Sequence, residues 1–369
     1  MPPYGRGTLA EVLPSACGAL GLPGFVDSLG LTSPDAPPIQ HVVILLVDGL
    51  GWHQLRAHPD LAPCLQGDRS ISAAFPSTTP VGLATLGTGV APGMHGMVGA
   101  AFLLPETGTI LHPLTWGDDP HPIAVQPERT VLERAEAAGA VVRSVGPRAF
   151  AQSGLTRAAL RGGDYAGADS VGERIAEACI SHGMPTLTYV YWGDLDKTGH
   201  IHGVDSDAWR EELRHVDALA ARLRRALPAD AALLVTADHG MVDSDEADRI
   251  DIDAIAALRH GVRRLAGEPR MRHVYARRDA AAEVMATWSD VLGSRAWVMS
   301  REGAVDCGLF GDVEADYAER IGDVVAIARD RTTLCSAQTD ALVSSLRGQH
   351  GSTSPDEMSV PLTVLVGES

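Results

Sequence analysis

The segment HVVILLVDG, residues 41–49, places seven mostly apolar residues directly before an aspartate and a glycine. Two further runs of the same kind follow, TLTYVYW at 186–192 and AALLVTA at 231–237. Runs that are apolar throughout, rather than at every second position, are typical of strands buried on both faces of a sheet. We therefore predict that these three segments are central strands of a mainly parallel sheet.

Helical patterns lie between these runs. The segment 206–227 carries apolar residues at helical spacing, beginning with Trp209, Leu213 and Val216, as expected for a helix with one face on the core. A shorter helix is expected at about 9–20, before the turn-rich SPDAPPI at 33–39. Alternating strands and helices predict an α/β fold in which a mainly parallel central sheet has helices on both faces.

The chain divides into three parts on the same criteria. Residues 1–40 are expected to form an N-terminal helical extension, and 41–267 with 313–369 the α/β core. Residues 268–312 suggest a strand, a helix and a strand, which predicts a small inserted α+β cap. The chain is expected to return to the core through DVVAIAR at 323–329 and to end in the apolar run VPLTVLV at 360–366.

Composition limits the partners of the protein. A formal net charge of −17 at pH 7 disfavours binding to a nucleic-acid polymer or to an anionic membrane surface. The apolar runs are too short to cross a bilayer, and the N-terminus lacks the pattern of a secretory signal. Five cysteines without a CxxC pair predict reduced thiols. We expect a cytoplasmic location, and nothing in the sequence indicates an oligomeric state.

Acidic and imidazole side chains follow the predicted strands. Because the carboxyl ends of the strands in such a sheet open on one crevice, these side chains should converge. Carboxylates with imidazoles suit Zn²⁺, with manganese or iron as alternatives. A single aspartate after a strand is also a common helix cap, so the argument depends on the whole set. Its members are Asp48, Asp194, Asp196, His200, Asp238, His239 and, from the later segment GQHGS, His350.

A hydroxyl group stands at the start of another predicted helix, in FPSTTP at 75–80. Pro80 fits the first helical position, which would make Thr79 the N-cap. Thr79 then either only caps the helix or, at the positive end of the helix dipole, serves as a nucleophile beside bound metal and an anionic phosphate. Thr78 and Ser77 are the alternative nucleophiles.

Five motifs occur in one order along the chain. They are VDGLG (47–51), FPSTTP with LGTGVAPGMHGMVG (75–80 and 86–99), DLDKTGH (194–200), TADHGM (236–241) and GQHGS (348–352). In this order they resemble the alkaline phosphatase superfamily, most closely its nucleotide pyrophosphatase/phosphodiesterase branch, over about residues 41–361.

This resemblance implies two divalent metal ions, most simply Zn²⁺. It places Asp48, Asp238, His239 and the Thr79 hydroxyl on one ion, and Asp196, His200 and His350 on the other. Thr79 would attack phosphorus and form a phosphoryl-threonine that water then hydrolyses. Two divalent cations among three aspartates leave a small positive charge that can receive a small anionic phosphate ester in an acidic protein.

The sequence departs from the branch at two points. Ala100 in HGMVGAAF stands where the branch commonly has an asparagine that holds a phosphate oxygen, so Lys197 or the Thr79 amide would have to bind that oxygen. PVG at 80–82 replaces an aromatic-Pro-Asn run. The predicted cap and the segment 100–130, including Trp116, are the expected determinants of specificity.

The motifs indicate a hydrolase of phosphodiester or pyrophosphate bonds in small molecules such as nucleotides. The sequence leaves alternatives to this function open. Phosphomonoesterase or phosphonate hydrolase activity is the nearest one. A metal-containing binding protein that has lost catalysis is a second. The sequence lacks the C/S-x-P-x-R motif of sulfatases, the GNH segment of calcineurin-like phosphoesterases and the G-x-S-x-G motif of serine hydrolases.

Overall fold

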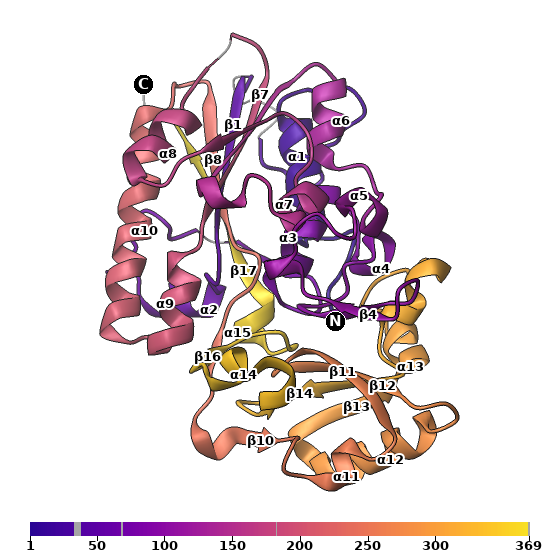
Figure 1. Cartoon of the computed structure of the whole chain (residues 1–369). Helices are drawn as coiled ribbons and strands as arrows, with labels where there is room; N and C mark the ends of the chain where they lie inside the picture. The colour runs from indigo at the N-terminus through magenta and orange to yellow at the C-terminus, as the bar shows by residue number, and fades with distance from the viewer. Residues whose placement is uncertain (33–37, 68, 182, 368–369) are drawn as a thin grey trace.

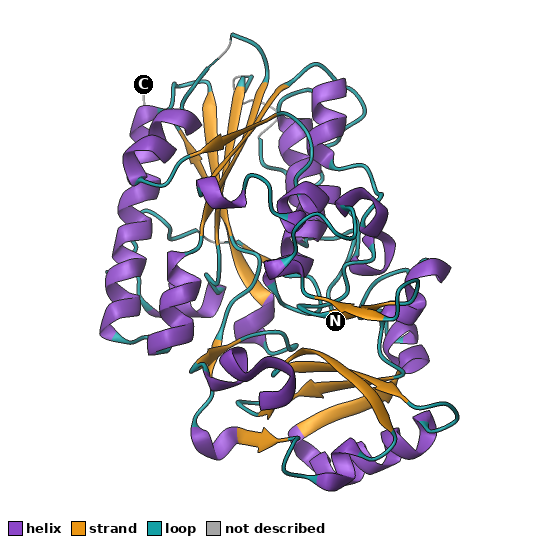
Figure 2. Ribbon diagram, viewed as in Figure 1, coloured by secondary structure: helices purple, strands orange, loops and turns teal. Residues whose placement is uncertain are grey.

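The central element of the protein is a seven-stranded sheet flanked by two layers of helices, as seen in a computed structural model that describes residues 1–32, 38–67, 69–181 and 183–367 (Figures 1 and 2). Neighbouring strands are all parallel except β17, which runs antiparallel to β8 and β2. The strands lie in the order β2 (Ser70–Ser72), β17 (Ser359–Val366), β8 (Ala231–Thr236), β1 (His41–Val47), β7 (Thr186–Trp192), β5 (Val141–Gly146) and β6 (Asp164–Gly167). The predicted fold class is confirmed.

The three predicted strands lie side by side in the middle of this sheet. Every residue of β1 and of β8 is buried, which is why neither segment alternates polar with apolar residues. The observed bounds match the predicted ones, except that the third strand ends at Thr236.

Helices cover both faces of the sheet (Figure 1). One layer holds α8 (Val171–Ala178), α9 (Asp194–His202) and α10 (Asp207–Ala226); the other holds α1 (Val12–Ala19), α3 (Thr79–Thr88), α6 (Val131–Ala137) and α7 (Gly154–Ala159). Shorter elements are η1 (Leu9–Glu11), α2 (Trp52–Ala57), α4 (Pro92–His95), η2 (Pro113–Thr115), α5 (Pro122–Val125), η3 (Arg148–Phe150) and α15 (Pro355–Met358).

The predicted amphipathic helix at 206–227 is α10. Its stripe of apolar residues from Trp209 to Leu223 is buried, and Ser206 caps it by accepting a hydrogen bond from the Trp209 amide. The helix expected at 9–20 is divided between η1 and α1. Residues 33–37 of the predicted connecting turn lie outside the described ranges. Within those ranges, every helix falls short of the length or the apolar character that a membrane span requires.

A second, antiparallel sheet lies at the lower end of the molecule in Figure 1. Its strands are, in order, β11 (Val262–Glu268), β12 (Met271–Ala276), β14 (Val324–Ala328) and β13 (Ala296–Ser300). The helix α12 (Ala281–Leu292) packs on it and buries Trp288. Next to this sheet, β10 (Arg249–Asp251) pairs with β15 (Thr333–Cys335).

The second sheet extends beyond the segment 268–312 that the sequence indicated for a cap. The run DVVAIAR, interpreted as the return to the core, instead forms β14, between β12 and β13. A fully buried central strand has the same apolar pattern in any sheet, so the pattern did not distinguish the two sheets.

The remaining elements are short. They are β3 (Phe102–Leu104), β4 (Thr109–Leu111), β9 (Val242–Asp243), η4 (Glu246–Asp248), α11 (Ala256–Arg259), η5 (Gly293–Arg295), α13 (Arg301–Asp306), η6 (Ala315–Arg320), α14 (Ala337–Ser345) and β16 (Gly348–Gln349).

Candidate metal centre and active site

The carboxyl ends of β1 and β8 bring three of the predicted side chains together. Asp48 follows β1, and Asp238 with His239 follows β8, which pairs directly with β1. The three side chains are buried, and one ligand atom from each lies within 4.8 Å of the others. Gly49, at φ +75°, turns the chain at this point, where a Cβ atom would lie 2.9 Å from Asp196.

The second group is built from a helix and a loop. Asp196 and His200 are four residues apart on α9, so both point from one face, with His200 Nε2 3.3 Å from Asp196 Oδ2. Pairing of β16 with β9 places His350 beside them, its Nε2 atom 3.2 Å from that of His200. The imidazole ring of His350 stacks on that of His239 at 3.7 Å between centroids, so the two groups are neighbours.

Backbone carbonyl groups orient the three imidazole rings. The Nδ1 atoms of His200, His239 and His350 lie 2.7, 3.0 and 2.9 Å from the carbonyl oxygens of Gly348, Gly240 and Ser77. A carbonyl only accepts, so each Nδ1 carries the proton and each Nε2 turns a lone pair toward the carboxylates. A carbonyl group behind a histidine in this way is the usual support for a metal-binding imidazole.

These donor sets fit divalent cations. Asp196 Oδ1 and Asp238 Oδ2 are buried and accept no hydrogen bond. Burial first, and then the charges of the neighbouring carboxylates, raises the pKa of Asp48 well above its usual range and that of Asp238 to about 7. Burial, with the neighbouring histidines, lowers the pKa of His350 well below its usual value. A bound cation would give these unpaired carboxylate oxygens and neutral imidazoles a partner.

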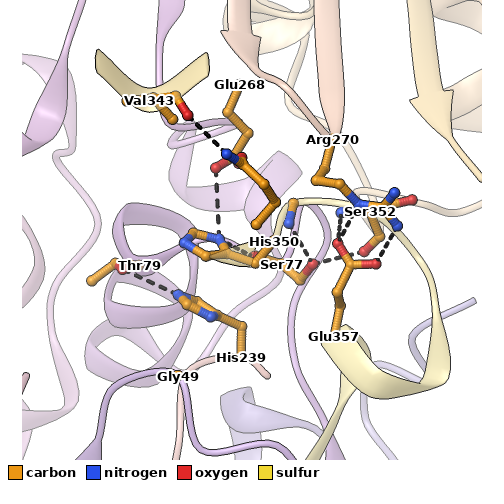
Figure 3. Close-up of polar contacts among 12 residues, drawn as sticks. Gly49, Ser77, Thr79, His239, Glu268, Arg270, Val343, His350, Ser352 and Glu357 are labelled. Carbon is orange, nitrogen blue, oxygen red and sulfur yellow. Dashed lines mark hydrogen bonds and ion pairs between the residues drawn. The ribbon is translucent and has the colours of Figure 1, made fainter. Parts of the chain in front are cut away.

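Thr79 lies at the junction of the two groups. Its Oγ1 atom is 3.2 Å from His239 Nε2 (Figure 3). The same atom is 3.4 Å from each carboxylate oxygen of Asp48. The predicted cap was wrong by one position, since Thr78 is the N-cap of α3 and Pro80 occupies N2. Proline fits throughout the first turn, where amide hydrogens have no helical partner, so it did not fix the position.

The alternative nucleophiles are less available. Ser77 is buried, its Oγ donating to the Ser352 carbonyl at 2.7 Å and accepting from the Gly351 amide at 3.1 Å. Thr78 lines the same cavity as Thr79, but its side chain hydrogen-bonds the carboxyl group of Glu268. Asp194 is exposed on α9 and lies outside both ligand groups.

A cavity of about 550 Å³ opens beside Thr79. Its lining includes Asp196, His200 and His350 from the second group, together with Lys197 and Ala100. Lys197, the predicted substrate contact, is one of the residues on the cavity wall. Trp116 is buried instead and donates its indole N–H to the Pro120 carbonyl, while the nearby Leu114 lines the cavity.

Two residues of the site were not predicted. The hydroxyl of Tyr191 in β7 donates to Asp48 Oδ2 at 2.5 Å. A tyrosine close to the carboxyl end of a central strand, where the predicted acids gather, was the available signal. Glu268, at the end of β11, lies with Oε2 3.6 Å from His350 Nδ1, and burial raises its pKa. It comes from the second sheet, so no motif of the first sheet pointed to it.

The chain is similar to known phosphoesterases in sequence. The family model described as type I phosphodiesterase / nucleotide pyrophosphatase matches residues 42–354. The human ectonucleotide pyrophosphatase/phosphodiesterase family member 7 is 35% identical over 65 residues, which are 16% of this chain and 14% of that protein. The matched stretch is thus a small part of the human protein.

The fold is similar to that of two kinds of solved structure. An inactive threonine-to-alanine variant of murine ectonucleotide pyrophosphatase/phosphodiesterase 5, in complex with AMP, has a TM-score of 0.69 at 18% identity over 88% of this chain and 87% of that one. Phosphonoacetate hydrolase from Sinorhizobium meliloti 1021, in complex with phosphonoformate, has a TM-score of 0.69 at 21% identity over 90% and 91%. At these identities the likeness concerns the fold.

The resemblance drawn from the five motifs is confirmed, because the family model covers most of the chain. The chain belongs to the type I phosphodiesterase / nucleotide pyrophosphatase family of the alkaline phosphatase superfamily, a family of metal-dependent hydrolases of phosphoric esters.

Proposed function

We propose that this protein hydrolyses phosphodiester or pyrophosphate bonds in small molecules, with Thr79 as the nucleophile. One observation carries the proposal: Thr79 Oγ1 lies within 3.4 Å of Asp48 and His239, on the wall of a cavity that His200 and His350 also line. Because Thr78 and not Thr79 is the N-cap of α3, a capping role does not account for this hydroxyl.

Two divalent ions would be held by the two groups described above, with Thr79 completing the first. Zn²⁺ is the first expectation from the mixed carboxylate and imidazole donors, and manganese or iron are the alternatives. When bound, such ions lower the pKa of a hydroxyl or water and neutralise charge on phosphate oxygens.

The residues of the chain then carry out a double displacement. Thr79 Oγ1 forms a bond to phosphorus while the bond from phosphorus to the leaving-group oxygen breaks. That oxygen takes the bonding electron pair and, overall, the proton that Thr79 loses. Water next attacks the phosphoryl-threonine, which releases the phosphate product and returns the proton to Thr79. Lys197, on the cavity wall, supplies a positive charge for a phosphate oxygen in place of the amide side chain absent at Ala100.

Phosphonate or phosphomonoester hydrolysis is the second candidate. It is favoured by Ala100, which removes a polar contact that the diesterase branch commonly has, and by the likeness in fold to a phosphonoacetate hydrolase. A protein that has lost catalysis is disfavoured, because both ligand groups and the threonine are present together.

Metal content and turnover test the proposal together. We expect about two metal ions per chain by mass spectrometry, one for each ligand group. We also expect chelator-sensitive hydrolysis of bis-p-nitrophenyl phosphate that exceeds hydrolysis of p-nitrophenyl phosphate. A preference for the monoester would support the second candidate. A metal-loaded protein that hydrolyses neither compound nor a phosphonate would contradict both.

A further inference from the structure

Three large apolar side chains remain exposed around the cavity beside Thr79. Leu114, Ile201 and Leu342 are 63%, 55% and 76% exposed, and all three line this cavity. They come from η2, α9 and α14, which are far apart in the sequence. Single exposed apolar residues are common on protein surfaces, but their convergence on one cavity indicates an apolar ligand.

The inner wall of the cavity has the same character. Ala100, Ala101, Val343 and Leu346 contribute further apolar surface. Ala100 is the residue that stands in place of the polar side chain expected from the family branch. The substitution therefore extends an apolar wall.

Charges on the cavity wall do not favour a second anionic group. Among the described residues that line it, Lys197 is the only lysine or arginine. Glu268 and Asp340 are acidic, and Asp340 is already paired with Arg272. Glu268 Oε1 is buried and accepts no hydrogen bond. Beyond the two metal-ligand groups, a polyphosphate chain would meet one lysine and no arginine among the described residues of this wall.

A smaller pocket shares Thr79 and Leu114 with this cavity and has similar walls. Its lining includes Leu83, Leu155 and Phe150, the last of which is 45% exposed. A phosphate held at Thr79 would therefore have apolar surface in both pockets that open beside it.

We propose that the cavity lined by Leu114, Ile201 and Leu342 binds an uncharged, apolar ester group of the substrate. The preferred substrates are then phosphodiesters that carry an alkyl or aryl group, rather than nucleoside polyphosphates. This inference rests on the proposed function, because it assigns the cavity to the substrate of Thr79.

The test uses straight-chain alkylphosphonates, from methyl to hexyl, as competitive inhibitors of p-nitrophenyl methyl phosphate hydrolysis by the metal-loaded protein. Affinity should rise about twofold to fourfold for each methylene until the cavity is filled. A chain of the same length that ends in a carboxylate should bind at least about tenfold more weakly, because its charge loses hydration without gaining a partner.

Variants locate the effect. Leu342→Asn should weaken binding of hexylphosphonate about fivefold and leave methylphosphonate unchanged, because Leu342 is exposed and its substitution removes only apolar contact. Val26→Asn is the matched control, since Val26 is 75% exposed and lies outside the lining of both pockets. It should change neither affinity.

Affinity that is independent of chain length, or higher for the carboxylate chain, would overturn the inference. Equal effects of Leu342→Asn on the methyl and hexyl compounds would also overturn it. The same affinities are measured by calorimetry, which does not require turnover. A protein that hydrolyses no ester would contradict the proposed function. The calorimetric chain-length series would still uphold or reject this inference.

Discussion

Asp48 and Asp238 lie buried at neighbouring strand ends, and their raised pKa values follow from burial and from the charges around them. In the metal-free protein the folded state keeps protons there that the unfolded chain has lost near neutral pH. Folding therefore takes up protons at these groups, and their contribution to stability falls as the pH rises from about 4 toward about 7.

We accordingly expect Asp238→Asn to raise the Tm of the chelator-treated protein more at about pH 8 than at about pH 5. With metal present the wild type should have the higher Tm, because it gains binding free energy that the variant loses. Thermal unfolding of both proteins at the two pH values, with and without Zn²⁺, measures these Tm values. An equal gain at the two pH values would show that the pKa of Asp238 is not raised in the folded protein.

At the scale of elements, hydrogen bonds tie the second sheet to the site. Arg270, between β11 and β12, forms a buried two-bond pair with Glu357 of α15 (Figure 3). Glu357 also accepts from the Ser352 amide at 2.9 Å, and the Ser352 carbonyl accepts from Ser77. His350, two residues earlier, is held by the Ser77 carbonyl.

Glu357→Gln should therefore weaken the Asp196–His200–His350 group more than the other one. We expect about a tenfold loss of affinity for one of the two metal ions, the usual effect of losing a supporting contact. Asp340→Asn is the matched control, because it weakens the pair with Arg272, two residues after Arg270, at a comparable cost in stability. Metal titration of both variants measures the two affinities. Equal losses of metal affinity at both ligand groups in Glu357→Gln would contradict this account.

The elements also show what the sequence could predict. Apolar runs placed β1, β7 and β8 and the acids that follow them, because full burial leaves a strong pattern. The order of strands and the position of β17 depend on packing between distant segments, which single segments do not record. Gly82 illustrates this: a Cβ atom there would lie 2.6 Å from that of Asp238, a close approach visible only in the folded chain.

For the whole molecule, the second sheet supplied what the motifs missed. Glu268 and Gly267 line the cavity from β11, and α14 adds Leu342. Five ligand residues could be predicted because they come after β1, β7 and β8 of the first sheet, whereas His350 follows β16 and was indicated by the GQHGS motif. The lining that sets specificity could not be predicted, since it is assembled from segments without a shared pattern.

Net charge also acts at this scale. The chain carries a formal charge of −17, which repels an anionic substrate before it reaches the site. We expect kcat/KM for an anionic diester to rise about twofold when salt screens this repulsion, between about 10 and 200 mM. Uncharged p-nitrophenyl acetate, measured at the same salt concentrations, controls for effects of salt on the optical assay itself. A kcat/KM that falls with salt would mean that attraction by the site dominates approach.

The most direct test of Thr79 as the nucleophile is rapid acid quench of the metal-loaded protein during turnover of p-nitrophenyl methyl phosphate, followed by mass spectrometry of its peptides. The account predicts a methylphosphoryl group on Thr79, its absence in Thr79→Ala together with loss of hydrolysis, and its return in Thr79→Ser. Hydrolysis by Thr79→Ala at the wild-type rate would contradict the account, and so would an adduct on Ser77 or Thr78 in place of Thr79.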